Sequence, residues 1–156
     1  MKRSLIILLY FMGVSVLAQA QLSANKQAII ASVEKHEAEL IKMSDQIWAN
    51  AEIAFKETKS AEILASYAEK NGFKVDRGVA GMPTAFVATY GSGKPVISVL
   101  GEFDALPGIS QKAQPTKAPL KEGAGGHGCG HNLFGTASLG AAIAVKELIA
   151  TGKIKG

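Results

Sequence analysis

The chain has 156 residues, of which 47% are hydrophobic and 19% are charged. Such a composition fits one globular domain with a real core, and the length is short for a two-domain enzyme. The formal net charge is +4. Because the lysines are scattered and form no concentrated basic face, a nucleic acid is not expected as the partner.

The first twenty residues have the layout of a secretory signal peptide. Lys2 and Arg3 precede an almost unbroken apolar run, and Ala18 and Ala20 offer the small side chains that signal peptidase reads. The run is too short for a standard spanning helix, although an uncleaved anchor is the alternative. We therefore expect residues 1–20 to direct export to the periplasm or the exterior. No later segment is apolar enough to span a membrane, so no stable membrane insertion is expected after cleavage.

The first half of the mature chain reads as two helices and a strand. Apolar side chains recur at three- and four-residue spacing from Ser23 to about Phe55, with Trp48 on the apolar stripe, which predicts a long amphipathic helix. His36 lies among charged residues on this helix and is expected to be solvated. A second helix is predicted to be capped by Thr58 or Ser60 and to end at Asn71-Gly72, because these residues tolerate a left-handed conformation. A short strand follows over 73–76.

The second half is predicted to hold two more strands, a long loop and a last helix. Residues 78–83 form a turn, 84–90 alternate as a strand does, and 91–94 make a tight hairpin connection. The β-branched run Pro95–Leu100 fits a strand buried on both faces. Residues 101–130 hold three of the five prolines and predict a long loop, and residues 132–150 predict a helix.

This order of elements predicts a three-layer α/β domain. Ligand sites in such sheets lie at the carboxyl ends of the strands, and the loop after Leu100 leaves from such an end. Loops of this length in compact domains are usually functional or disordered. The loop is therefore where we look for chemistry.

Two clusters of polar side chains flank the loop. Glu102 and Asp104 follow the predicted buried strand and share one side of an extended chain. His127, Cys129 and His131 alternate with glycines directly before the last helix. A thiolate with an imidazole suits zinc, and a nearby carboxylate could bind the ion or orient a ligand histidine. Metal binding would also explain a single cysteine in an exported chain, which cannot form an internal disulfide.

Three other readings stay open from the residues alone. The carboxylates could cap a turn or helix, the glycine-rich loop could be merely flexible, and Cys129 could be the nucleophile of a thiol-dependent hydrolase. The last is disfavoured because residues two apart rarely act as nucleophile and base for each other, and no third activating group is evident.

The motifs Gly-Glu-Phe-Asp-Ala-Leu-Pro (101–107) and Gly-His-Gly-Cys-Gly-His-Asn (126–132) resemble the aminoacylase- and carboxypeptidase-type metallopeptidase family of amidohydrolases, in particular its aminobenzoyl-glutamate branch. The resemblance runs from about Ala28 to Gly156. It implies a zinc-peptidase-like catalytic domain, with a smaller domain for dimerisation. It also implies a centre of two divalent ions, zinc first and manganese second, and a small amide substrate: an N-acyl or aminobenzoyl amino acid or a short dipeptide.

The resemblance also implies roles for the five residues of the two clusters. Cys129 and His131 correspond to metal ligands, and Asp104 corresponds to an aspartate beside the metals that orients a ligand. Glu102 stands where many relatives have aspartate or histidine. His127 lies in the motif without being a usual ligand. We expect Glu102 and His127 to contact the metal ligands without binding the metal themselves, or to contact the substrate.

The family's general-base glutamate and its further ligands find no counterpart after His131, since Glu147 matches no such motif. Residues 21–156 are therefore expected to form the N-terminal part of the catalytic domain, without the C-terminal half or the dimerisation domain. With two ligands instead of the usual four, this chain should hold metal poorly and should not turn over substrate. The complete enzyme is expected to be a homodimer or to work with a related subunit. The alternative is a non-catalytic metal-binding fragment or partner subunit.

Overall fold

The computed structural model describes residues 22–156, so the predicted signal peptide over 1–20 lies outside the described residues. The described chain is mixed α/β, with three α-helices and one two-stranded antiparallel sheet. The helices are α2 (Ala24–Asn50), α3 (Thr58–Lys70) and α4 (His131–Ala150). The strands are β1 (Lys74–Arg77) and β2 (Phe86–Thr89), with a short 3-10 turn, η1 (Val79–Gly81), between them.

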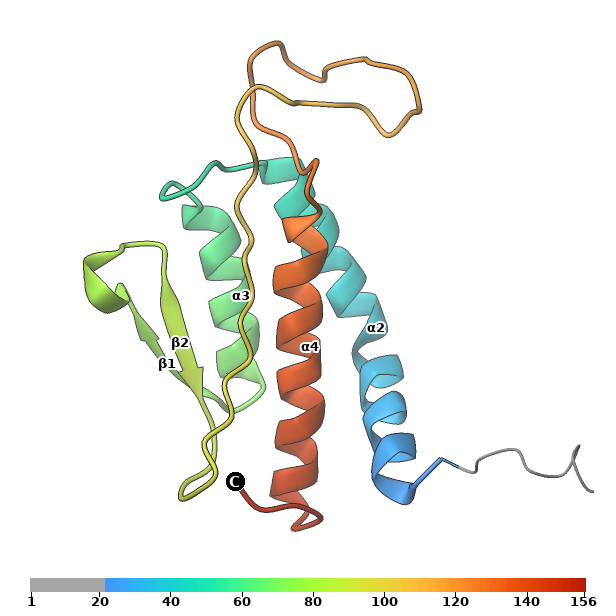
Figure 1. The fold of residues 1–156 in the computed structure, drawn as a ribbon, viewed down its shortest axis with the longest axis vertical. Helices are drawn as coiled ribbons and strands as arrows, with labels where there is room; N and C mark the ends of the chain where they lie inside the picture. Colours follow the sequence, from blue (N-terminus) through green and yellow to red (C-terminus); the bar gives the residue numbers. More distant parts are fainter. Residues whose placement is uncertain (1–21) are drawn as a thin grey trace, which may run out of the picture.

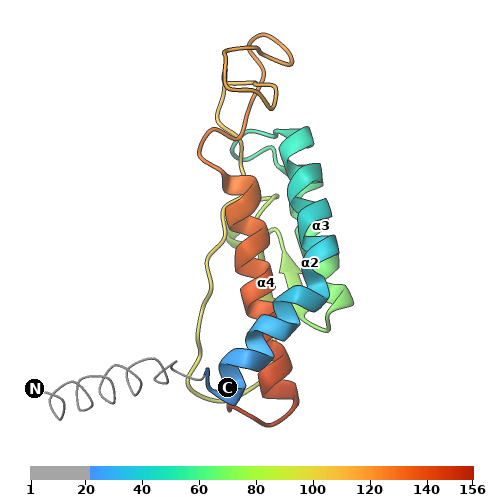
Figure 2. The same ribbon diagram turned by 90° about the vertical axis from the view of Figure 1, so that its right-hand side faces the viewer.

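The three helices pack against one another and hold the core. Helices α2 and α4 run antiparallel and make the most extensive contact in the molecule (Figures 1 and 2). Ile47 on α2 and Ile143 on α4 are at most 1% exposed, and Leu64 on α3 is 2% exposed. The sheet covers α3, and Phe86 of β2 packs against the buried apolar side chains of the core. Burial of these apolar side chains is the main force that holds the elements together.

The predicted helices are confirmed, with changes at their ends. Helix α2 begins after Ser23, whose side chain accepts a hydrogen bond from the backbone N–H of Lys26, and it ends at Asn50 rather than near Phe55. It stops there because Ala51 adopts a left-handed conformation, with φ of 43°. Helix α3 spans Thr58–Lys70 and ends before Gly72, which has φ of 83°, as the sequence predicts.

The cap of α3 comes from an earlier residue than the sequence indicates. Neither Thr58 nor Ser60 caps the helix; the carboxylate of Glu52 accepts hydrogen bonds from the backbone N–H groups of Lys59 (3.1 Å) and Ser60 (2.8 Å). The Ser60 hydroxyl donates a further bond of 2.8 Å. Burial by itself would raise the pKa of Glu52, but these bonds together hold it below its ordinary value. A carboxylate at this helix start also suits the positive end of the helix dipole.

The predicted strand over Pro95–Leu100 is wrong for the described chain. Residues 91–104 run extended across the front of the molecule in Figure 1, but within residues 22–156 their backbone makes no backbone hydrogen bond to another segment. Val96, Ile97 and Leu100 are 73–81% exposed. The β-branched run has the composition of a buried strand, yet in the part of the chain that the structure describes no strand pairs with it. The observed hairpin is instead the one between β1 and β2.

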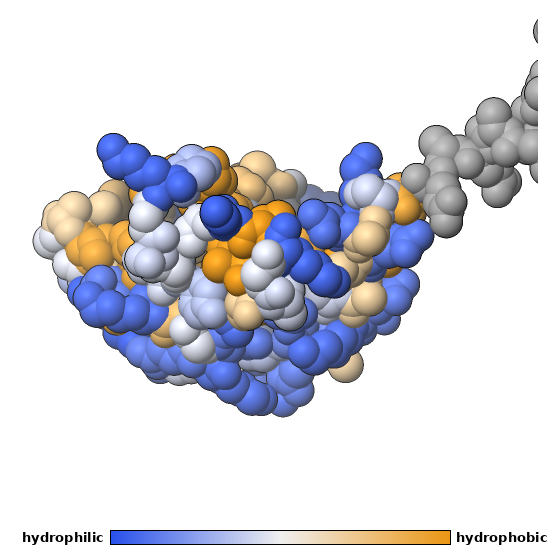
Figure 3. Space-filling view, turned by 90° about the horizontal axis from the view of Figure 1, so that it is seen from below, coloured by the Kyte–Doolittle hydropathy of each residue, from blue (hydrophilic) through white to orange (hydrophobic). Residues whose placement is uncertain are grey.

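A second difference from the sequence-based prediction concerns the apolar composition of helix α4. It is the one helix within residues 22–156 whose length and apolar composition would allow it to cross a membrane, so the expectation that no later segment reaches that threshold is wrong by this measure. Its buried side chains, among them Leu139 and Ile143, pack against α2 and α3, and a core helix can have the same composition. Apolar surface is nevertheless open to solvent elsewhere, as Figure 3 shows at the lower end of the molecule.

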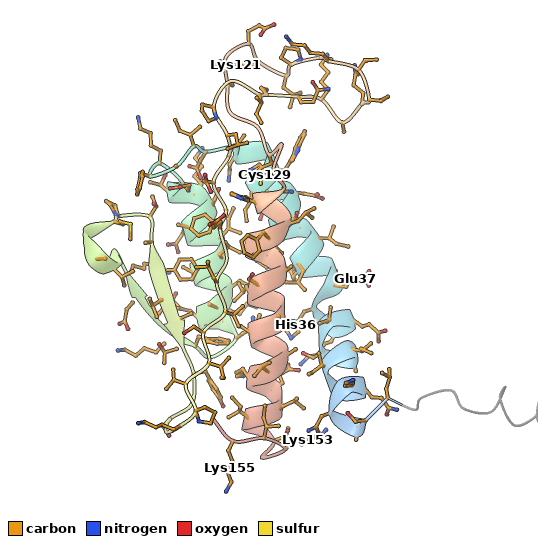
Figure 4. The ribbon with its side chains drawn as sticks, in the orientation of Figure 1. His36, Glu37, Lys121, Cys129, Lys153 and Lys155 are labelled. Atoms are coloured by element: carbon orange, nitrogen blue, oxygen red, sulfur yellow. The ribbon has the colours of Figure 1, made fainter. Side chains whose placement is uncertain are left out.

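A partly buried polar network joins α2, α3 and α4 and corrects the prediction that His36 is solvated. Its side chain is only 13% exposed, with Nδ1 2.7 Å from the hydroxyl of Tyr67 and Nε2 3.3 Å from Glu147. Figure 4 shows His36 on the side of α2 that faces α4. Lys35 donates a bond of 2.8 Å to the same Glu147 oxygen. His36 therefore joins parts of the fold that are distant in the sequence, because Tyr67 belongs to α3 and Glu147 to α4.

Candidate metal centre

The two ends of the long loop are tied together at its base. Leu106 and Gly126 exchange two backbone hydrogen bonds of 3.0 Å, and the N–H of Ala105 donates a bond of 2.7 Å to the carbonyl of Glu52. Gly125 is required here, because a Cβ at this position would lie 2.6 Å from the carbonyl oxygen of Ala51. These contacts hold the segments 102–104 and 127–131 at the same end of the helical layer, while residues 107–124 project away from it (Figure 1).

The N-terminus of α4 presents His131 to the other segment. Gly130 has φ of 84°, a conformation that favours glycine, and it lets the chain turn from the loop into the helix. His131 is the first residue of α4, and the next residue, Asn132, donates a buried hydrogen bond of 3.0 Å to the Ser44 hydroxyl of α2. The start of α4 is thereby fixed against α2.

The structure brings Glu102, Asp104 and His131 together. The ring of His131 lies between the two carboxylates: Nδ1 is 2.7 Å from Oδ1 of Asp104, and Nε2 is 3.1 Å from Oε2 of Glu102. One potential ligand atom from each residue lies within 4.8 Å of those of the other two. The side chains of His131 and Asp104 are 17% and 24% exposed, and that of Glu102 is 52% exposed. The cluster is thus anchored on its inner side and open to solvent at Glu102.

Cys129 lies two residues before His131 and is a free, exposed thiol. Figure 4 shows it beside the N-terminal end of α4. It is not one of the three residues of the cluster, and among the described residues no hydrogen bond joins it to a histidine. Its assignment as a metal ligand stays a prediction.

His127 turns inward, away from the cluster. Its Nε2 lies 3.1 Å from the carbonyl oxygen of Ile47 in the last turn of α2, and its Nδ1 is buried with no hydrogen-bond partner within residues 22–156. Burial lowers the pKa of His127, against the opposing effect of the Ile47 bond. A neutral ring is therefore favoured, with its proton on the nitrogen that faces the carbonyl.

The position of Glu102 follows only in part from the sequence. Its spacing from Asp104 was the available signal, and it correctly put both carboxylates on one side of an extended chain. The contact of Glu102 with Nε2 of His131 depends on how α4 approaches the segment. Gly135 allows that approach, because a Cβ there would lie 2.9 Å from the carbonyl oxygen of Glu102.

No protein-family model matches the chain. It is 56% identical over 108 residues to a subunit of p-aminobenzoyl-glutamate hydrolase from Escherichia coli (strain K12), a match that covers 67% of this chain and 22% of the relative. It is 31% and 30% identical over 121 residues to thermostable carboxypeptidases 2 and 1 from Saccharolobus solfataricus, covering 74% of this chain and 30% of each relative. The chain thus spans less than a third of the length of these relatives. Its matched residues place it in the amidohydrolase and carboxypeptidase family that its motifs predict.

Proposed function

We propose that this chain contributes part of a divalent-metal centre to a hydrolase that cleaves amide bonds. The substrate class is N-acyl or aminobenzoyl amino acids, or short dipeptides. The observation that carries the proposal is the position of the His131 ring between the carboxylates of Asp104 and Glu102. The names of the relatives, a p-aminobenzoyl-glutamate hydrolase subunit and two carboxypeptidases, support amide hydrolysis.

The donor set fits a divalent cation. A neutral histidine carries one proton, so it can donate to only one of the two carboxylates that face its ring nitrogens. With that proton on Nδ1 and donated to Asp104, the lone pair on Nε2 faces the carboxylate of Glu102. These two electron-rich atoms, 3.1 Å apart, repel each other unless a second ring proton or a bound cation offsets their charge. At zinc sites a ligand histidine commonly donates its other ring N–H to a carboxylate. Here Asp104 can accept that N–H from His131, and Glu102 lies beside the other ring nitrogen.

We assign the roles accordingly. His131 and Cys129 are the proposed ligands, and Asp104 orients His131 by accepting its Nδ1–H. Glu102 contributes charge or a ligand oxygen from the exposed side. Zinc is the first candidate and manganese the second, with two ions in the complete enzyme. When bound, such ions lower the pKa of a water and polarise an amide carbonyl.

The relatives are much longer than the region that matches this chain. Since the chain spans 22–30% of its relatives, we propose that the remaining ligands, the general-base glutamate and a dimerisation domain lie in the region that these relatives carry beyond the match. There the chain would form the N-terminal part of a three-layer zinc-peptidase-like domain, in a homodimer or with a related subunit. By itself it would bind metal weakly and turn over no substrate.

The function is tested with a chimera. The 108 matched residues of the E. coli hydrolase subunit are replaced by those of this chain, and cleavage of p-aminobenzoyl-glutamate is assayed with zinc or manganese. We expect activity that a chelator abolishes and that His131→Ala removes. A folded chimera that cleaves neither this substrate nor N-acyl amino acids would contradict the proposal.

A second candidate is a non-catalytic metal-binding subunit. It is favoured by the name of the E. coli relative, which is one subunit of a hydrolase. Metal binding by this chain, with an inactive chimera, would select it. A thiol-dependent hydrolase, the third reading, predicts instead that alkylation of Cys129 stops activity and that chelators leave it unchanged.

We also propose that residues 1–20 direct export. The test is expression of the whole chain in a bacterial host, followed by fractionation and N-terminal sequencing. Release of a chain that begins at Gln21 into the periplasm or medium supports export, whereas retention in the cytoplasm with Met1 intact would contradict it.

A further inference from the structure

His127 makes a contact with a residue that lies far from it in the sequence. Its Nε2 lies 3.1 Å from the carbonyl oxygen of Ile47, 80 residues earlier in the sequence. A carbonyl oxygen only accepts hydrogen bonds, so the ring nitrogen donates. Ile47 is fully buried in the last turn of α2, which makes it a rigid point of attachment.

This contact sits at one end of the turn that carries Cys129. The backbone N–H of Gly130 donates a bond of 3.2 Å to the carbonyl of His127, which closes the four-residue turn 127–130. The only side chains in this turn are those of His127 and Cys129, because the other two residues are glycines. Among the described residues, His127 is the one side chain of this turn that makes a hydrogen bond to another element.

The start of α4 has a separate attachment. Asn132 binds Ser44 of α2 through a buried hydrogen bond, and Asp104 holds the ring of His131. Loss of the His127 contact should therefore leave His131 in place and displace Cys129. The bond from His127 to Ile47 therefore holds the segment of Cys129 to α2, and the bond from Asn132 to Ser44 holds the segment of His131.

We propose that His127 is a positioning residue: it ties the turn 127–130 to the carboxyl end of α2 and so fixes Cys129 relative to the cluster of Glu102, Asp104 and His131. The inference rests on the proposed metal centre. It assigns His127 no contact with metal or substrate and explains why its ring faces the protein interior rather than the cluster.

The test compares three variants of the chain. His127→Phe keeps a ring and loses the donor, whereas His127→Gln keeps an N–H that can reach a carbonyl. His36→Phe is the matched control, because it removes another partly buried histidine that joins α2 to the rest of the fold, through Tyr67 and Glu147. Each protein is titrated with Co²⁺, following thiolate-to-cobalt absorption, and its unfolding midpoint in urea is measured.

We expect His127→Phe to weaken cobalt binding about 10–100-fold, as removal of a residue that supports a ligand typically does, and to abolish the thiolate absorption. His127→Gln should retain most of the affinity. His36→Phe should lower the unfolding midpoint and keep the cobalt affinity. Equal affinity for the wild type and His127→Phe would overturn the inference, as would equal losses in the Phe and Gln variants.

A metal-free measurement separates this inference from the proposed function. Hydrogen exchange at the amide of Gly130, which donates to the carbonyl of His127, reports on the turn itself. We expect His127→Phe to accelerate it at a denaturant concentration where His36→Phe does not. If the wild type binds no cobalt but this difference is found, the metal centre fails and the positioning of the turn stands; without the difference, the positioning role is wrong.

Discussion

The side chains of Asp104 and His131 meet at 2.7 Å, between Oδ1 and Nδ1, although the residues lie 27 positions apart in the sequence. The long loop between them is tied at its base by Leu106 and Gly126, so the contact is set by the fold and not by neighbouring sequence. It leaves Nε2 of His131 facing Glu102 on the exposed side of the cluster. Both the metal affinity and the stability of the chain should depend on this arrangement and on the core that supports it.

Replacing Asp104 by Asn should weaken metal binding without unfolding the chain. The amide keeps the size of the carboxylate but removes the charge that favours an Nδ1–H on His131. We expect a loss of about 10–100-fold in zinc affinity, measured by competition with a chromophoric chelator. Glu122→Gln is the control, because it removes a carboxylate outside the cluster. Similar affinities for the two variants would remove Asp104 from the proposed centre.

Gly135→Ala and Gly140→Ala should have different effects on the same helix. Alanine favours an isolated helix over glycine by about 1 kcal/mol. At position 135 the new Cβ would lie 2.9 Å from the carbonyl oxygen of Glu102, and backbone must shift. At position 140 it would lie 3.0 Å from the end of the flexible Leu40 side chain. We expect metal affinity to fall for Gly135→Ala alone, as measured by zinc titration.

The core prediction concerns Ile47, which is fully buried between helices. Ile47→Ala should lower the free energy of unfolding by about 2–5 kcal/mol, because the deletion leaves a cavity as well as losing apolar burial. Ile41 on the same helix is 55% exposed, so Ile41→Ala should change stability by roughly 0.5 kcal/mol or less. Urea unfolding followed by circular dichroism measures both.

The pH dependence of stability should include Glu147. Hydrogen bonding and charge from Lys35, with a further bond to His36, lower the pKa of Glu147 from 4.5 to about 2. A group whose pKa is lowered on folding stabilises the fold above its unfolded pKa, and that contribution disappears as the pH falls from about 4.5 toward 2. The Glu147→Gln variant should therefore be less stable at pH 7 by up to about 1 kcal/mol, since the pair is partly exposed.

The comparison is made on unfolding midpoints between pH 7 and pH 2. The wild type should lose more stability than Glu147→Gln over the acid part of that range, and the two curves should converge near pH 2. Parallel curves at all pH values would show that the carboxylate of Glu147 contributes no linked stability.

The sequence predicted features set by local signals and failed where distant segments decide. The end of helix α3 is predicted correctly because Asn71-Gly72 is a local signal, whereas the cap of the helix comes from Glu52, which lies outside it. The run Pro95–Leu100 has strand composition, but composition cannot show whether a neighbouring strand is present, and here its side chains face solvent. The prediction that His36 is solvated fails because its partners Tyr67 and Glu147 are remote in the sequence.

The candidate site is predictable in part, because its two motifs are local features of the sequence. The motifs around Asp104 and Cys129 point to the two ends of the loop, and the structure brings these two ends together. The spacing of Glu102 and Asp104 put both on one side of the chain, and the structure brings both to His131. The inward turn of His127 could not be read from sequence, because the carbonyl of Ile47 is a backbone group that any residue would supply.

The most direct test of the metal centre is a Co²⁺ or Zn²⁺ titration of the chain beside its His131→Ala variant, by calorimetry and absorption. We predict weak, saturable binding that His131→Ala abolishes, with thiolate-to-cobalt absorption if Cys129 is a ligand. Binding of equal strength in both proteins, or no binding to the folded wild type, would contradict the proposed centre.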